Sequence, residues 1–294
     1  MKIIALKDGE KLMTRRKFIK TIFGTLLTFI SLVSGTYAYA YYIEPRLIHN
    51  NRQLISSKKI PKSFDKFKIV QFSDTHLGFH FSLEQLETLI KKINSEHPDV
   101  IVFTGDLIDK PQNYQSKKKL IHSLNKLRAT SGKYWVYGNH DHGGYGTKMI
   151  HEIMDQANFT LLKNNYTTIE KDDERIILAG IDDVMLGKPN LKQTFKNIQP
   201  DDYTILLAHE PDIASEVSEY PVDLQLSGHS HGGQVRLPFI GHLYTPPYAE
   251  KYIQGNYKLN GGKMNLFVSA GIGTTRLPLR LFCQPEYYTF TFMH

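Results

Sequence analysis

From residue 66 onward, short apolar segments alternate with helical patterns along the chain. The expected strands are Phe67–Phe72, Val100–Thr104, Tyr134–Tyr137, Ile176–Ala179, Thr204–Ala208, Leu224–Leu226, Leu266–Val268 and Tyr287–Phe292. Three helices are expected. The first begins at the Ser82–Gln85 capping box, and the other two cover about Lys117–Arg128 and Tyr145–Ala157. This order of strands and helices predicts an α/β fold in which helices cover the sheets.

Five of these expected strands are followed at once by Asp, Asn or His. The segments are Ser73-Asp74-Thr75-His76, Gly105-Asp106-Leu107-Ile108-Asp109, Gly138-Asn139-His140-Asp141, His209-Glu210-Pro211 and Ser227-Gly228-His229-Ser230-His231. Each pattern alone is as often a turn or a helix cap. Because the carboxyl ends of strands in an α/β sheet share one edge, the five together predict a single site.

The donor chemistry of these segments indicates metal binding. Imidazole and carboxylate groups without a thiolate suit Zn, Fe or Mn. Seven or eight donors are too many for one tetrahedral ion, and they suit two ions that share a carboxylate. Such a pair of ions is typical of enzymes that hydrolyse phosphoesters, in which it activates a water and neutralises charge on the phosphate oxygens.

The ordered set Asp-x-His, Gly-Asp-x-x-Asp, Gly-Asn-His-Asp, His and Gly-His-x-His resembles the calcineurin-like metallophosphoesterase superfamily over about residues 66–294. The resemblance implies a four-layer α/β/β/α sandwich. It also implies two divalent metal ions (Mn, Zn or Fe), one held by Asp74, His76, Asp106 and His231 and the other by Asp106, Asn139, His209 and His229, with Asp106 bridging them. By the same match, His140 protonates the leaving oxygen or stabilises the phosphate, and Asp141 orients His140. Lys110 stands where the family often has Arg.

Two further segments, Gly228–Pro238 and Ser269–Pro278, resemble the YkuE/YaeI-like branch of exported bacterial phosphoesterases. Related members cleave the pyrophosphate of a UDP-linked lipid A precursor. The resemblance therefore implies a phosphodiester or pyrophosphate substrate, small or lipid-linked, in or near the cell envelope. A phosphomonoesterase or phosphoprotein phosphatase of the same fold is the alternative, and a non-catalytic metal-binding module is a further one.

The N-terminal residues predict an export or anchoring segment. Residues 21–43 contain no charged side chain, and as a helix they reach ~34 Å, enough to cross a hydrocarbon core of ~30 Å. The preceding Arg15-Arg16 pair resembles a twin-arginine signal, which implies the twin-arginine export machinery as a partner. A plain signal anchor is the alternative. Both interpretations place the C-terminal domain outside the cytoplasm, and Ala38-Tyr39-Ala40 offers a cleavage site.

The expected organisation is a signal or anchor at residues 1–43, a linker at 44–65 and a metallophosphoesterase domain at 66–294. The formal charge of +7 supports it, because residues 1–40 carry seven basic against two acidic residues and the remainder carries 29 against 27. The nearly neutral domain gives no global electrostatic case for a nucleic-acid partner, and none is expected.

Several side chains outside the motifs are weaker candidates. Those for substrate contact are the aromatic residues Phe79, Phe81, Tyr244 and Tyr248, and those for a phosphate clamp are Arg236, Arg276 and Arg280. The alternatives are packing in the core for the aromatic residues and solvation at the surface for the arginines. His142 and the Asp182-Asp183 pair lie beside expected strand ends but match no ligand motif. The single Cys283 excludes a disulfide within the chain.

Overall fold

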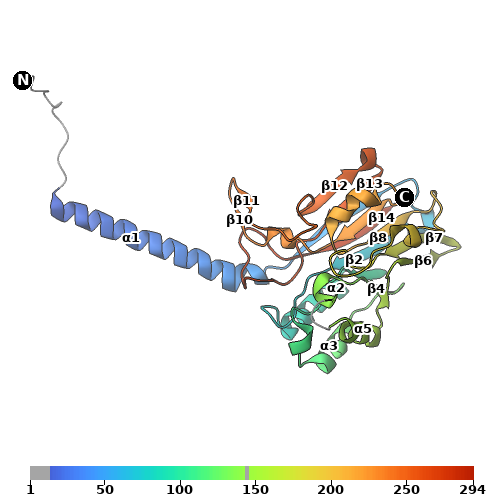
Figure 1. Ribbon diagram of the computed structural model, residues 1–294, viewed down its shortest axis with the longest axis horizontal. Coiled ribbons are helices and arrows are strands. Elements are labelled where there is room, and N and C mark those ends of the chain that lie inside the picture. The colour runs from blue at the N-terminus through green and yellow to red at the C-terminus, as the bar shows by residue number, and fades with distance from the viewer. Residues whose placement is uncertain (1–13, 143–145) are drawn as a thin grey trace, which may run out of the picture.

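The computed structural model describes residues 14–142 and 146–294, which form two stacked sheets with a long N-terminal helix projecting from one end (Figure 1). The strands are β1 His49–Ser56, β2 Lys68–Phe72, β3 Val100–Phe103, β4 Lys133–Trp135, β5 Thr160–Leu161, β6 Asn165–Lys171, β7 Glu174–Gly180, β8 Thr204–Leu207, β9 Leu224–Ser227, β10 Arg236–Leu237, β11 Gly241–His242, β12 Gly255–Leu259, β13 Met264–Val268 and β14 Glu286–Met293. The helices are α1 Arg15–Ala38, α2 Leu83–Ser95, α3 Lys117–Leu124, α4 Asn139–His142, α5 Thr147–Gln156, α6 Leu191–Thr194 and α7 Ala214–Val217.

Each large sheet has a parallel centre. The first has the order β1-β14-β2-β3-β4-β5, and its strands β2 to β5 are parallel. The second has the order β12-β13-β9-β8-β7-β6, in which β7, β8, β9 and β13 are parallel. The carboxyl ends of β2, β3 and β4 therefore share one edge of the first sheet, and those of β8 and β9 share one edge of the second.

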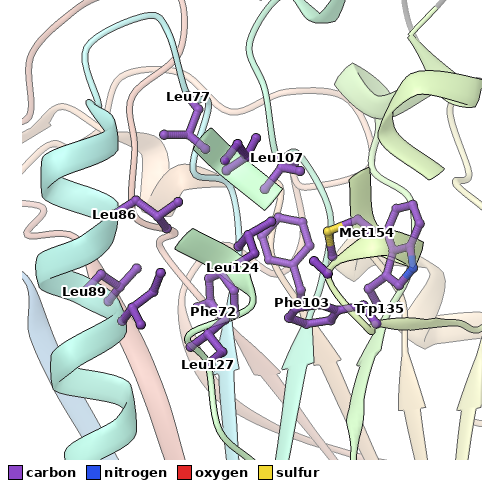
Figure 2. Close-up of a cluster of buried hydrophobic side chains, with 14 of the residues drawn as sticks. Phe72, Leu77, Leu86, Leu89, Phe103, Leu107, Leu124, Leu127, Trp135 and Met154 are labelled. Carbon is purple, nitrogen blue, oxygen red and sulfur yellow. The ribbon is translucent and has the colours of Figure 1, made fainter. Parts of the chain in front are cut away.

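Helices α2, α3 and α5 cover the outer face of the first sheet. Helix α2 begins at the Ser82–Gln85 capping box, and its buried residues Leu86, Leu89, Ile90 and Ile93 form one stripe. Figure 2 shows Leu86 and Leu89 of this stripe facing Phe72 and Phe103 of the sheet, with Trp135 and Met154 completing the cluster on the far side. Burying a side chain of this size stabilises the fold by roughly 1.5–3 kcal/mol before entropic costs.

A second apolar layer fills the space between the sheets, and a third lies on the outer face of the second sheet. Ile69 and Val102 meet Leu178 and Leu226 between the sheets. On the outer face, the short helices α6 and α7 and their loops pack against the strands. This confirms the four-layer α/β/β/α sandwich, although its last layer is thin. Since the strands are buried on both faces, they read as continuous apolar runs rather than alternating ones.

The prediction of a linker at residues 44–65 is wrong for much of this segment. His49–Ser56 is strand β1, which pairs in parallel with β14 from His49 opposite Glu286 to Ser56 opposite Met293. The strand was missed because it lies at the edge of the sheet, where a polar sequence is favoured and no apolar pattern is required. Ile60 and Phe64 are also fully buried, so the folded domain includes most of this segment.

Other expected elements differ mainly at their ends. Helix α3 ends at Leu124 instead of Arg128, and the strands agree to within a few residues. The edge strands β5, β6 and β12 were not expected, for the same reason as β1. The start expected at Tyr145 for helix α5 lies outside the described residues, as do residues 1–13 of the expected signal.

Helix α1 is long and apolar enough to cross a membrane, and none of its side chains is buried. Its end continues without a break through a turn of π-helix at Tyr39–Ile43 into the domain. The side chain of Thr14 caps the helix by accepting from the N–H of Lys17. The expectation of a membrane-spanning or signal helix before an α/β domain therefore stands as a candidate span at this position.

Candidate metal centre

The residues expected at the strand ends lie together where the two sheets face each other. Asp74 and His76 follow β2, and Asp106 follows β3. Asn139, His140 and Asp141 lie on α4, which follows β4. His209 follows β8, and His229 and His231 follow β9. Their side chains are buried, with the exception of the pair Asn139 and His140 at the start of α4.

One group of ligand atoms comes from Asp74, His76 and His231, whose donor atoms all lie within 4.8 Å of one another. The Nε2 atoms of His76 and His231 are 3.0 Å apart, and His231 Nε2 lies 3.6 Å from Asp74 Oδ1. Two imidazole nitrogens that face each other beside a carboxylate have the arrangement of ligands to a single cation.

A second group comes from Asp106, His209 and His229. His229 Nδ1 lies 3.1 Å from His209 Nε2, which in turn lies 3.4 Å from Asp106 Oδ2. The same oxygen of Asp106 is 3.5 Å from His76 Nε2, in the first group. Asp106 thus stands between the two groups, in the position of a carboxylate that bridges two ions.

The residues present fit a pair of metal ions. The Oδ1 atom of Asn139 is buried and has no hydrogen-bond partner within the described residues. A buried amide oxygen without a hydrogen bond needs another partner, and a bound cation would be one. The donor set contains oxygen and imidazole nitrogen without a thiolate, which suits Mn, Zn or Fe.

Backbone carbonyls fix the tautomers of two histidines. His209 Nδ1 lies 2.6 Å from the carbonyl oxygen of Thr104, and His229 Nε2 lies 2.9 Å from that of Pro247. A carbonyl oxygen only accepts, so these ring nitrogens are the protonated ones. The lone pairs of His209 Nε2 and His229 Nδ1 are therefore directed into the site, as metal ligation requires.

The electrostatics of the site agree with this arrangement. Burial lowers the pKa of His229 to about 3, and it lowers the pKa of His231 as well, so both rings are neutral. Burial also opposes charge on His209, but the carboxylates of Asp106 and Asp74 hold the pKa of His209 well above its ordinary value. The two carboxylates thus favour positive charge at His209 Nε2, where a proton and a metal ion compete for the same lone pair.

His140 lies at the mouth of the site, and its ring is positioned by Asp109. His140 Nδ1 donates to the carbonyl oxygen of Asp109 over 2.8 Å. The ring of His140 also packs edge-on against the ring of His76, with 4.6 Å between the ring centroids. The carboxylate of Asp109 also lies 3.5 Å from His76 Nδ1. Asp109 is the last residue of the Gly-Asp-x-x-Asp motif, and its role in positioning these two histidines was not expected from the sequence.

Asp141 has different partners from those expected. Its Oδ2 accepts from the N–H groups of Asp106 and Gly138 at 2.8 and 2.9 Å, and its Oδ1 accepts from the N–H of Leu107 at 3.0 Å. The carboxylate has no hydrogen bond to the ring of His140 among the described contacts. Asp141 therefore joins the loop after β3 to the loop after β4, and it does not orient the His140 ring directly.

The backbone of the site is tightly wound. Asp74, His76, Asp106, His229 and His231 all have positive φ, between 42° and 67°. L residues occupy this region at a cost, and such strain gathers at functional sites. At Gly138, a Cβ atom would collide with Asp106 Oδ1 and with the His209 ring, so glycine is required there.

The weaker candidates divide between core, surface and cavity. Arg280 is fully buried, and its guanidinium donates to the carbonyl oxygens of Ala270, Gly271, Gly273 and Cys283. It is therefore no phosphate clamp, because its donors already have partners. Arg236 is half-buried and donates to Gln254 Oε1 at 2.8 Å. Arg276 is exposed, and its guanidinium lies 4.4 Å from the ring centre of Tyr244.

The remaining candidates lie away from the ligand atoms. Phe81 is buried in the core, Phe79 borders a separate groove, and Tyr248 is absent from the cavity lining among the described residues. His142 Nε2 lies 2.8 Å from Asp182 Oδ1. Asp183 accepts from the N–H groups of Leu186 and Gly187. These contacts make both aspartates anchors of the loop after β7.

A cavity of about 390 Å³ opens beside the ligand atoms. Its polar lining consists of His76, Asp106, Asn139, His140, His229 and His231. Its apolar lining includes Val235, Leu243, Tyr244, Pro246, Leu277 and Leu279, and Arg276 lines the same cavity. The cavity therefore combines polar groups suited to cations with apolar side chains.

Comparison with known proteins agrees with this geometry. Residues 67–233 match the family described as calcineurin-like phosphoesterase (Metallophos). The chain belongs to this family. The matched range includes every residue of the two ligand groups. Calcineurin-like phosphoesterases use a dinuclear metal site, and the clustered Asp and His side chains of this member fit one.

Three relatives extend the comparison. The chain is 48% identical over 282 residues to the uncharacterized metallophosphoesterase YkuE of Bacillus subtilis, which covers 96% of this chain and 98% of that one. It is 28% identical to the phosphodiesterase YaeI of Escherichia coli, over 94% and 97% of the two chains. A zebrafish transmembrane protein with a metallophosphoesterase domain is 26% identical over 95% of this chain and 64% of its own length. The likeness to the YkuE/YaeI-like branch of the calcineurin-like phosphoesterases is thus confirmed.

Proposed function

We propose that the chain is a metal-dependent hydrolase of phosphodiester or pyrophosphate bonds, and that its substrate is an amphipathic, lipid-linked phosphoester of the cell envelope. The observation that carries this proposal is the cavity, whose lining contains both the ligand groups and apolar side chains. A substrate with a charged phosphoester and an apolar portion matches both parts of this lining. The likeness to a phosphodiesterase of Escherichia coli supports the diester class.

Two divalent ions, Mn, Zn or Fe, would supply an activated water and positive charge at the phosphate oxygens. Asp74, His76, Asp106 and His231 would hold one ion, and Asp106, Asn139, His209 and His229 the other. The side chains of this chain then perform the remaining steps. His140, whose Nδ1 is bonded to the Asp109 carbonyl, presents Nε2 to the substrate and in its protonated form donates to the leaving oxygen. Arg276, exposed at the cavity, pairs with a second phosphate oxygen.

The location proposed for the domain is outside the cytoplasm, with α1 as a membrane anchor. Export through the twin-arginine machinery agrees with the Arg15-Arg16 pair that opens α1. The test is the double variant Arg15→Lys with Arg16→Lys, followed by protease accessibility of the domain in intact cells. Retention of the double variant inside the cell supports this route. Unchanged surface exposure contradicts it and favours a plain signal anchor.

The test of the activity uses the full chain in detergent with Mn²⁺ or Zn²⁺. The substrates are a phosphomonoester, a phosphodiester, a UDP-linked pyrophosphate and a phosphopeptide. We expect metal-dependent turnover of the diester or the pyrophosphate, and its loss in Asp106→Asn. His151→Ala, on the exposed face of α5, is the matched control and should keep full activity. Turnover of the phosphopeptide or the monoester alone contradicts the proposed bond type, and no turnover of any substrate contradicts the enzyme.

A further inference from the structure

The hairpin of β10 and β11 carries apolar side chains that the domain leaves in solvent. At its tip, Phe239 is 109% exposed and Ile240 is 70% exposed; among the large apolar residues that the structure describes outside α1, only Leu54 of β1 is comparably exposed. Residues 237–248 contain no Asp, Glu, Lys or Arg. Neighbouring exposed apolar residues of this size indicate an interaction surface rather than an ordinary loop.

Hydrogen bonds connect this hairpin to the end of the candidate membrane helix. The N–H of Arg280 donates to the carbonyl oxygen of Ala40, just beyond α1, and the N–H of Phe282 donates to the carboxylate of Glu44. Between these two residues, Leu281 exchanges backbone hydrogen bonds with the start of the hairpin, accepting from Arg236 at 2.8 Å and donating to Gln234 at 3.1 Å. One layer of backbone thus separates the end of α1 from the base of the hairpin.

The position of the hairpin in the fold agrees with these contacts. Figure 1 shows β10 and β11 at the end of the domain that α1 enters, with the carboxyl terminus at the opposite end. Leu277 and Phe282 belong to the segment that lies in space between the end of α1 and the hairpin, and their side chains are 55% and 61% exposed. A bilayer crossed by α1 is therefore adjacent to this end of the domain.

We propose that the tip of the hairpin, Phe239 with Ile240, enters the interface of the bilayer that α1 crosses and forms a second membrane contact. The occupant of this surface is lipid, because the tip is apolar, it lacks charge, and one layer of backbone separates the base of its hairpin from a helix whose length and composition suit a membrane. Side chains of this type are buried to ~5–10 Å at the boundary between headgroups and acyl chains.

The contact has a consequence for the substrate, and this part rests on the proposed function. Leu243 and Tyr244 follow the hairpin directly and line the cavity. With the tip in the bilayer, this part of the cavity lining lies close to the lipid surface. The apolar portion of a lipid-linked phosphoester then reaches the metal centre without leaving the membrane, whereas a small soluble diester gains nothing from the hairpin.

The membrane contact is tested without catalysis. Full-length Ile240→Cys is labelled with an environment-sensitive fluorophore and reconstituted into vesicles of phosphatidylethanolamine and phosphatidylglycerol. Leu54→Cys is the matched control, because Leu54 is 74% exposed on β1 and pairs with Thr291 near the carboxyl terminus. The wild-type chain measures background labelling of Cys283, which is buried.

We expect nitroxide on the acyl chains to quench the label at position 240 and aqueous iodide to quench the label at position 54. Equal quenching by iodide at both positions overturns the membrane contact, whatever the enzyme assays show. In the second arm, Phe239→Ser with Ile240→Ser should lower kcat/KM for a diester lipid in vesicles by about tenfold and leave a soluble diester unchanged. Equal loss on both substrates contradicts delivery from the membrane, and turnover of neither by the wild-type chain contradicts the proposed function alone.

Discussion

The backbone N–H of Arg280 donates a hydrogen bond to the carbonyl oxygen of Ala40 over 2.9 Å. Ala40 is buried, and Glu44, also buried, accepts from the N–H groups of Phe282 and Cys283. The thiol of Cys283 in turn donates to the carbonyl oxygen of His231, a residue of the metal centre, at 3.3 Å. The junction between helix and domain is therefore part of the folded domain and is connected to the site.

From this contact we predict that the mature protein keeps α1. Cleavage after Ala40, at the small-residue motif, would detach Ala40 from the domain and leave the buried N–H of Arg280 without its partner, at a cost of about 1–3 kcal/mol. Intact mass spectrometry of the membrane-extracted protein is the measurement. A mature chain that begins at Tyr41 would show that the junction does not protect the peptide bond between Ala40 and Tyr41 from cleavage.

The ligand and acid roles are separable by paired variants. His229→Ala should lose bound metal together with activity, because His229 Nδ1 is directed into the second ligand group. His140→Ala should keep the metal and lose about 10²–10⁴-fold in kcat, since its expected part is proton transfer. Metal content by elemental analysis and steady-state rates are measured on the same samples, with His151→Ala as control. Loss of metal in His140→Ala would reassign that residue as a ligand.

Asp141→Asn should destabilise the fold without removing the metal. The amide nitrogen of Asn cannot accept from a backbone N–H, so at least one of the three donors at Asp106, Leu107 and Gly138 loses its partner. We expect the free energy of unfolding to fall by about 1–3 kcal/mol. Urea unfolding in detergent measures it, and Asp155→Asn, exposed on α5, is the control. Unchanged stability with a large loss of rate would instead support an orienting role toward His140.

Asp182 should contribute to acid sensitivity. Although its burial opposes charge, hydrogen bonds from His142 and from the N–H of Lys188 lower the pKa of Asp182 to about 2. An unfolded Asp titrates near ~3.9, so the folded state favours the carboxylate. Its contribution is complete above about pH 4 and is lost as the pH falls toward about 2. Thermal unfolding of Asp182→Asn should therefore depend less on pH in this window than that of wild type, whereas Asp172→Asn should match wild type. Identical slopes for Asp182→Asn and wild type would refute this contribution.

The central strands were predictable from the sequence because they are buried on both faces and read as continuous apolar runs. Val100–Phe103 and Thr204–Leu207 are examples. The edge strand His49–Ser56 was not, since one neighbour and a solvent-exposed side impose no apolar pattern. The ends of α3 and the short helices α6 and α7 depend on local packing, which the helical period does not encode.

The sequence by itself determined which residues reach the site, because a polar residue placed directly after a buried strand has only the sheet edge to occupy. Tertiary structure decided what each does there. The sequence predicted Arg280 as a candidate phosphate clamp and Asp141 as the residue that orients His140, yet their contacts are with backbone carbonyl and N–H groups. The partners of a buried carboxylate can come from a segment distant in the chain, as Asp141 accepts from the N–H groups of Asp106 and Leu107, and only the folded protein places them in contact.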